Sequence, residues 1–209
     1  MLFIAHRINT IEELVKLPQH VGVELDLRDV GNDLVLVHDP FSTGQKFEDY
    51  LKHYRHGLMI LNIKSERIEL RVLELLKKYN IQKYFFLDSS FPMIVLLSKQ
   101  GEHKIAMRFS EFEGLDSIFA MHGKVEWVWV DCFTQLPINK QNYALLKRLG
   151  YKLCLVSPEL QGRDQDIEMY RDYLMREGIV FDAICTKSYN INRWQLVTKQ
   201  QETSATISI

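Results

Sequence analysis

The sequence has few cysteines, no long apolar run and almost no net charge. Its three cysteines, Cys132, Cys154 and Cys185, each lie in an apolar, strand-like run, and no C-x-x-C motif is present. The odd count argues against a disulfide framework, and the spacing argues against a soft metal site. We therefore expect buried free thiols in a reducing, cytoplasmic compartment. The net charge of −1 provides no broad positive field for nucleic acid or an anionic membrane.

Several longer patterns are also missing. No apolar run approaches the ~18 residues that a transmembrane helix needs, and the amino-terminal residues lack the pattern of a signal peptide. No G-x-G-x-x-G motif follows the first predicted strand, which counts against a dinucleotide-binding fold, and no P-loop is present. The composition, 46% hydrophobic and 25% charged over 209 residues, is typical of one soluble globular domain.

The most informative stretch runs from Val21 to Pro40. Within it, Glu24, Asp26 and Arg28 alternate with apolar residues, so in a strand their side chains point to the same face. Burying two carboxylates together costs several kcal/mol unless something compensates their charge. A divalent cation is an economical compensation, because Mg²⁺ and Ca²⁺ prefer oxygen ligands.

Two histidines stand where predicted strands end. His6 closes the apolar run 2–5, and His38 closes the run 34–37. Either histidine alone is better explained as a polar residue at a strand end. Together with the alternating carboxylates, the pair indicates acid–base chemistry near neutral pH beside a metal.

Strand-like and helix-like runs alternate along the chain, with a hairpin extension over 34–37 after a turn at Gly31-Asn32. The expected strands are 2–6, 21–28, 58–63, 84–88, 104–109, 127–131, 152–156 and 181–186. The expected helices are 10–17, 47–54, 66–79, 91–99, 115–121, 140–149 and 164–177. Eight strands alternating with helices predict a single-domain α/β protein, a (β/α)₈ TIM barrel over 1–199. An open doubly wound sheet is the alternative. Residues 200–209, rich in Thr, Ser and Gln, are expected to be frayed.

A barrel would place functional residues at the carboxyl ends of its strands. Asn62 and Lys64 share one strand face, and Lys64 could neutralise a phosphate oxygen or pair with a carboxylate. Arg108 could clamp a phosphate or carboxylate with its planar guanidinium, and Arg28 could neutralise Glu24 and Asp26 or be held by Asp29. Further candidate contacts at the rim are Asp131, Glu159 and Lys187.

The segments His6-Arg7 with Asn9-Thr10, 22–28 and 34–39 resemble the glycerophosphodiester phosphodiesterase family. This resemblance implies a barrel with an acidic metal site for Mg²⁺ or Ca²⁺. It implies His6 and His38 as the acid–base pair, Arg7 as a phosphate contact, and Glu24 and Asp26 as metal ligands. Where the family usually has Glu-x-Lys, this chain has Asn62-x-Lys64. Asparagine can still offer its carbonyl oxygen to the metal, but one negative charge is lost.

The predicted function is therefore metal-dependent hydrolysis of a glycerophosphodiester-like or sugar phosphodiester. The substrate would be a small molecule, and no nucleic acid partner is expected because basic residues do not cluster beside exposed aromatic residues. Two alternatives stay open. The Asn62 departure suggests a degenerate barrel that binds a phosphorylated ligand without hydrolysing it. The third possibility is a metal-dependent isomerase or aldolase, in which Lys64 or Lys187 would form the Schiff base.

Overall fold

The computed structural model describes residues 1–195, so the predicted tail over 200–209 lies outside the described residues. Its centre is a barrel of eight parallel strands. They are β1 (Leu2–Ala5), β2 (Gly22–Val30), β5 (Met59–Ile63), β6 (Tyr84–Leu87), β7 (Ala106–Phe109), β8 (Trp127–Val130), β9 (Lys152–Val156) and β10 (Ala183–Thr186). β10 pairs with β1, and a single bridge between Phe86 and Ile105 joins β6 to the start of β7. The sheet therefore closes on itself, which confirms the predicted (β/α)₈ barrel and rules out the open sheet.

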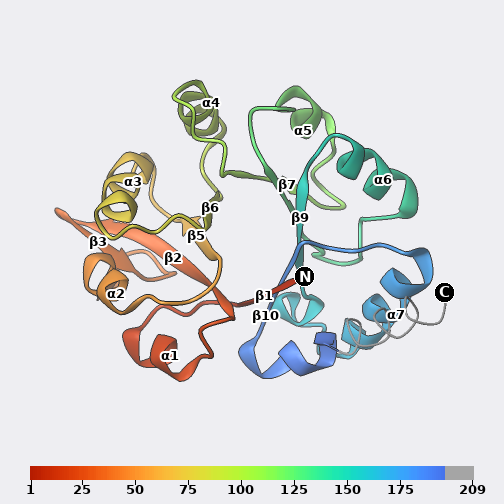
Figure 1. Ribbon diagram of the computed structural model, residues 1–209, viewed down its shortest axis with the longest axis horizontal. Coiled ribbons are helices and arrows are strands. Elements are labelled where there is room, and N and C mark those ends of the chain that lie inside the picture. Colours follow the sequence, from red (N-terminus) through yellow and green to blue (C-terminus); the bar gives the residue numbers. More distant parts are fainter. Residues whose placement is uncertain (196–209) are drawn as a thin grey trace, which may run out of the picture.

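Helices surround the barrel, as Figure 1 shows. They are α1 (Ile11–Lys16), α2 (Phe47–His53), α3 (Glu69–Lys78), α4 (Phe91–Lys99), α5 (Asp116–Ala120), α6 (Lys140–Arg148) and α7 (Ile167–Glu177), with short 3₁₀ turns η1 (Pro158–Gln161), η2 (Asp164–Asp166) and η3 (Ser188–Asn190). The predicted helix over 66–79 begins three residues late, at Glu69. Arg67 has φ of 66°, a left-handed conformation that a right-handed helix cannot contain.

A hairpin extends β2 beyond the barrel wall. β2 pairs antiparallel with β3 (Asp33–Leu36) through a turn in which Gly31 has φ of 61°, as the sequence predicted. The two-residue strand β4 (Gln45–Lys46), which was not predicted, pairs with β3. The hairpin returns the chain to the barrel end, where the Val37 amide donates to the Asp26 carbonyl at 3.0 Å. His38, the next residue, is thereby brought beside β2.

Two apolar layers hold the fold together. The larger layer lies between the strands and the helices, and the smaller one fills the barrel interior. Inside the barrel, the rings of Phe85 and Trp127 stack with centroids 4.6 Å apart. All three cysteines are buried and free, as expected. Alternate residues of the strands face inward, and toward the carboxyl ends several of these inward residues are polar, Glu24, Asp26 and Asn62 among them.

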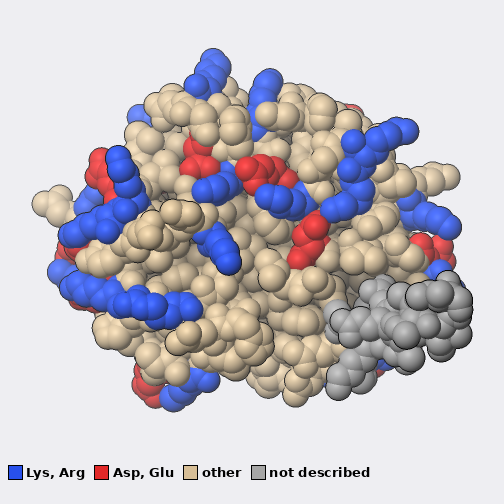
Figure 2. All heavy atoms as spheres, in the orientation of Figure 1, with Lys and Arg blue, Asp and Glu red and all other residues tan. Residues whose placement is uncertain are grey.

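The two ends of the barrel differ in character. In Figure 1, α1 to α7 follow one another clockwise, and because βαβ crossovers are right-handed, the amino ends of the strands face the viewer. Charged side chains gather near the middle of this face (Figure 2). The carboxyl ends of the strands, and the loops that follow them, lie on the opposite face.

Within residues 1–195, no helix has the length and apolar character needed to cross a membrane.

Candidate active site

Glu24, Asp26 and Asn62 lie together at the carboxyl end of the barrel. β2 and β5 pair in register, with Asp26 opposite Asn62, and all three side chains point into the barrel because the neighbouring residues on each strand pack outward. Glu24 is 1% exposed and Asp26 is 0% exposed. The Asn62 amide nitrogen donates to Glu24 Oε1 at 2.8 Å. The alternation seen in the sequence thus does bring these three polar groups into one buried site.

The loop after β1 holds both carboxylates in place. The Arg7 backbone amide donates to Glu24 Oε2 at 2.8 Å, and Arg7 Nε lies 3.8 Å from Asp26 Oδ2. Asn9 makes two bonds to Asp26: its side-chain nitrogen donates to Oδ2, and its oxygen accepts from the Asp26 amide, each at 2.9 Å. Asn9 was not predicted as a site residue. Its position just after His6-Arg7 was the available signal.

The protein's own donors and cations do not fully compensate the buried carboxylates of Glu24 and Asp26. Burial, together with repulsion from Asp26, raises the pKa of Glu24 to about 7, against hydrogen bonds from Asn62 and Arg7 that lower it. Among the described residues, Asp26 Oδ1 and Asn62 Oδ1 are buried without a hydrogen-bond partner. The nearest cation to Asp26 Oδ1 is Lys64 Nζ, at 3.9 Å. Two buried acceptor oxygens, one on Asp26 and one on Asn62, therefore lack a donor.

These features fit a hard divalent cation. Residues 1–195 contain no group of three or more His, Cys, Asp or Glu side chains arranged to hold a metal, so the donors would be two carboxylates and one amide oxygen. The Asn62 amide is oriented with its nitrogen on Glu24 and its oxygen unpartnered. Mg²⁺ and Ca²⁺ accept such mixed oxygen donors and keep bound waters or substrate oxygens in the remaining positions.

His6, at the end of β1, has a defined protonation pattern. Its ring is 16% exposed, and Nδ1 lies 3.2 Å from Lys187 Nζ. An ammonium group can only donate, so the His6 Nδ1 accepts and its proton resides on Nε2. Burial, then Lys187 and Arg7, lower the pKa of His6 to about 3. The ring is therefore neutral near pH 7.

His38 has the complementary pattern. Its ring is 40% exposed, and Nδ1 lies 2.8 Å from Asp39 Oδ1. Because an ionised carboxylate only accepts, Nδ1 donates, and in the neutral ring the lone pair is then on Nε2. This hydrogen bond holds the pKa of Asp39 below its usual range.

Arg28 fixes the backbone around His38. Its Nε donates to the His38 carbonyl at 3.0 Å, and its Nη1 donates to the Lys64 carbonyl at 2.8 Å. The expectation that Arg28 neutralises Glu24 and Asp26, or is held by Asp29, is therefore not what its hydrogen bonds show. Arg28 is a positioning residue that ties the loop after β3 to the end of β5.

The remaining predicted residues form a chain of alternating charge across the mouth. Lys64 Nζ lies 3.2 Å from Asp88 Oδ2, and Arg108 contacts both Asp88 and Asp131, with Glu113 Oε1 3.7 Å from its Nε. Lys64 and Arg108 thus already have carboxylate partners. Their assignment as phosphate contacts remains a prediction.

Asp131 and Glu159 are tied into the loops that carry them. Asp131 also accepts from the Trp129 indole at 3.3 Å and from the Cys132 amide at 2.8 Å. Glu159 accepts from Ser157, from Thr186 and from the Lys187 amide. Their role as rim contacts stays a prediction, while Lys187 meets His6 as described.

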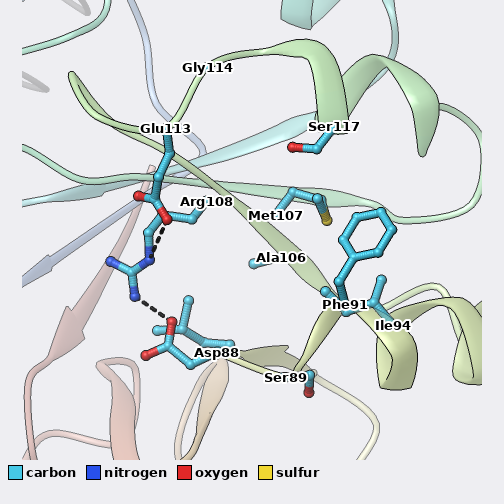
Figure 3. Close-up of a pocket in the computed structure, with 11 residues that line it drawn as sticks. Asp88, Ser89, Phe91, Ile94, Ala106, Met107, Arg108, Glu113, Gly114 and Ser117 are labelled. Atoms are coloured by element: carbon cyan, nitrogen blue, oxygen red, sulfur yellow. Dashed lines mark hydrogen bonds and ion pairs between the residues drawn. The ribbon is translucent and has the colours of Figure 1, made fainter.

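A cavity of about 520 Å³ opens beside this chain of charges, between β6 and β7 and under α4 and α5. Figure 3 shows Asp88, Arg108 and Glu113 on one side of it, and Phe91, Ile94 and Met107 on the other. The cavity therefore has one charged wall and one apolar wall.

No sequence model of a known family matches this chain, and no curated protein does. Solved structures do match it. A glycerophosphodiester phosphodiesterase from Agrobacterium tumefaciens superposes with a TM-score of 0.62 at 16% identity, covering 88% of this chain and 96% of its own. One from Parabacteroides distasonis gives 0.64 at 12% identity, covering 93% and 85%. A second Agrobacterium protein, provisionally named as a glycerophosphoryl diester phosphodiesterase, gives 0.67 at 12% identity, covering 97% and 99%.

The chain has the fold of these phosphodiesterase structures. The similarity extends over 85–99% of the chains compared, so it includes the barrel and its surrounding helices. At 12–16% identity the similarity establishes the fold, and the roles of individual residues rest on the geometry of the site.

Proposed function

We propose that this protein is a divalent-cation-dependent hydrolase of phosphodiesters, acting on a glycerophosphodiester-like or sugar phosphodiester. The observation that carries the proposal is the complementary state of its two histidines. His38 presents a lone pair on Nε2, and His6 presents a proton on Nε2, at the same end of the barrel as the buried carboxylates. Phosphodiester cleavage needs one group to accept a proton from the nucleophile and another to give one to the leaving oxygen.

In this proposal His38 takes the proton from the attacking hydroxyl, which is either water or a neighbouring hydroxyl of the substrate. His6 donates its Nε2 proton toward the leaving oxygen while Lys187, whose Nζ lies 3.2 Å from His6 Nδ1, passes a proton to Nδ1, so the ring stays neutral and Lys187 becomes an amine. A bound phosphodiester anion opposes the effect of Lys187 and Arg7, the cations that lower the pKa of His6, and so makes protonation of His6 easier.

Arg7 supplies positive charge for the non-bridging phosphate oxygens. Its guanidinium is 44% exposed and faces the mouth from the Asp26 side. Glu24, Asp26 and Asn62 would hold the cation, which when bound would neutralise charge on the phosphoryl group.

Asn62 supports a second candidate, a barrel that binds a phosphorylated ligand without cleaving it. With asparagine in place of a carboxylate, the proposed ligand set carries at most two negative charges, which weakens its hold on a cation. The two candidates differ in one observable, the turnover of a diester in the presence of the cation. The isomerase or aldolase alternative gains no support, because Lys64 faces carboxylates and Lys187 donates to His6.

The first test is calorimetric titration of the metal-free protein with Mg²⁺ and with Ca²⁺. We expect one site, lost in Glu24→Gln. An exposed glutamate on α1, Glu12, provides the matched control, and Glu12→Gln should bind as the wild type does.

The second test follows hydrolysis of glycerophosphocholine by phosphorus NMR with the cation present. His6→Ala and His38→Ala should each lower kcat by about 10²-fold or more, whereas His53→Ala, an exposed histidine at the end of α2, should not. Cation binding without turnover of any glycerophosphodiester or sugar phosphodiester would favour the binding barrel. Turnover that is unchanged in His38→Ala would contradict the proposed base.

A further inference from the structure

Most of the exposed aromatic side chains lie at one end of the molecule. Over residues 1–195 the exposed aromatic residues are Phe41, Phe91, Phe112, Phe119, Phe133 and Tyr189. All but Phe119, which lies near the end of α5, belong to loops or helix starts that follow the carboxyl end of a strand. We call these five residues the mouth ring.

The members of the mouth ring come from five separate loops. Phe41 lies between β3 and β4, Phe91 begins α4 after β6, Phe112 follows β7, Phe133 follows β8, and Tyr189 follows β10. Because these strands all end on the same face of the barrel, the rings surround the candidate active site. Phe41 is fully exposed, and Phe112 and Tyr189 are each 74% exposed.

The opposite end of the barrel differs. Among residues 1–195, Phe119 is the one exposed aromatic side chain outside the mouth ring, and the exposed side chains near the amino ends of the strands include the aliphatic Leu2 and Val180. The surface of that end carries charged groups near the middle (Figure 2). Five aromatic rings left in water around one opening are unlike the singly scattered apolar residues of an ordinary surface, and a gathered set marks an interaction site.

We infer that the carboxyl face of the barrel docks onto the surface of a zwitterionic phospholipid assembly, with the mouth ring inserted among the headgroups. Aromatic side chains favour this interfacial layer, and their burial there adds to surface binding. The substrate would then be the phosphodiester of a lipid headgroup, a conclusion that rests on the proposed function. The docking itself does not depend on turnover.

The charges around the mouth favour a zwitterionic surface over an anionic one. Arg7 and Lys187 provide positive charge, and Asp39 and Glu113 provide negative charge on the same face. A headgroup with a phosphate and a trimethylammonium group offers both complementary signs. Exposed aromatic rings also attract the ammonium group through their π faces. Because charges of both signs are interspersed around the mouth, binding should depend little on salt.

The cavity beside the mouth has the amphipathic lining that such a ligand needs. Phe91 belongs to both the mouth ring and the apolar wall of the cavity, and Asp88 and Arg108 form the opposite, charged wall (Figure 3). The Phe112 and Phe133 rings lie with centroids 6.1 Å apart, and the Arg108 guanidinium lies 5.9 Å from the Phe133 ring. The Phe133 ring and the Arg108 guanidinium thus lie close together where a headgroup would enter.

The test is co-sedimentation of the protein with phosphatidylcholine vesicles, without added substrate. We expect the wild type to bind, and the double variant Phe41→Ser/Phe112→Ser to lose at least about tenfold in vesicle partition, because two exposed rings are removed. Phe119→Ser, which removes an exposed ring outside the mouth, should partition as the wild type does. Raising the NaCl concentration should leave binding unchanged.

Three outcomes would overturn the inference. They are wild-type protein that stays in solution, equal losses in the double variant and in Phe119→Ser, and a mouth ring that instead mediates self-association, detected by light scattering as a dimer that the double variant dissolves. Circular dichroism checks that the variants fold. Hydrolysis of soluble glycerophosphocholine by the wild type is measured separately, so failure of docking and failure of the proposed activity are distinguished.

Discussion

Replacing Glu24 by glutamine should stabilise the metal-free protein at alkaline pH. In the folded chain the pKa of Glu24 is raised to about 7 by burial and by Asp26, from an ordinary value of 4.5. Between these two pH values the folded state keeps a proton that the unfolded state releases. The free energy of unfolding therefore falls as the pH rises through this window, and the full penalty is present above pH 7.

The size of the effect follows from the change in pKa. An increase from 4.5 to about 7, at about 1.4 kcal/mol per pH unit, corresponds to about 3 kcal/mol of lost stability at about pH 8. Glutamine does not titrate, so Glu24→Gln escapes this loss. His6, whose lowered pKa makes stability rise with pH over an overlapping range, is present in both proteins, so the comparison between them removes most of its contribution.

The assay is urea unfolding of both proteins, freed of metal with a chelator, near pH 4.5 and near pH 8. The difference in unfolding free energy between Glu24→Gln and wild type should grow by about 3 kcal/mol in favour of the variant. Glu12→Gln is the control, because Lys16 lowers the pKa of Glu12 and its difference should change in the opposite sense. Parallel pH profiles for Glu24→Gln and wild type would refute the argument that a strained, buried charge occupies this site.

Two further substitutions test how the site and the first helix are held. Arg28→Met removes both bonds to the His38 and Lys64 carbonyls, so it should lower unfolding free energy by about 2–3 kcal/mol and lower kcat more than it raises KM. Arg71→Met, which removes one bond to a carbonyl in the distant hairpin turn, should change stability less and leave kcat unaltered. Thr10→Ala breaks the capping box at the start of α1 and should cost about 1 kcal/mol in thermal unfolding. A loss near zero would mean that Glu13 alone satisfies the exposed amides.

The fold and the position of the site could be predicted from the alternation of residues along the strands. Glu24 and Asp26 alternate with residues of the outer layer, and Asn62 has the same parity on β5. In a closed parallel barrel, alternate residues of a strand point to the same side, so this spacing alone places all three side chains in the barrel interior. His6 could be placed in the same way, because it directly follows a short apolar strand.

Hydrogen bonds to the backbone could not be predicted from the sequence. Arg28 was expected to seek carboxylates, yet it bonds to two carbonyls that lie far along the chain. Any residue type provides a carbonyl, so no sequence signal marks such a partner. The start of α3 was misplaced for a similar reason, since the left-handed conformation of Arg67 has no side-chain signature.

Pairing among charged residues was only partly predictable. Arg108 was expected to clamp an anionic group, and the partners that it has are the protein's own Asp88 and Asp131. Adjacent parallel strands place the residues after their carboxyl ends side by side, so these neighbours could be named once the strand order was known. Which carboxylate pairs with the Arg108 guanidinium depends on the side-chain rotamers, and a sequence pattern does not determine rotamers.

The joint between β6 and β7 has a consequence for how the barrel moves. Elsewhere neighbouring barrel strands share two to five residue pairs, whereas here one bridge between Phe86 and Ile105 completes the circle. A closed sheet opens most easily where two neighbouring strands share the fewest residue pairs. Sub-global unfolding and fast amide exchange should therefore begin between β6 and β7. The segments on the two sides of this joint then act as separable cooperative units, and the cavity with its paired charges sits on the line that divides them.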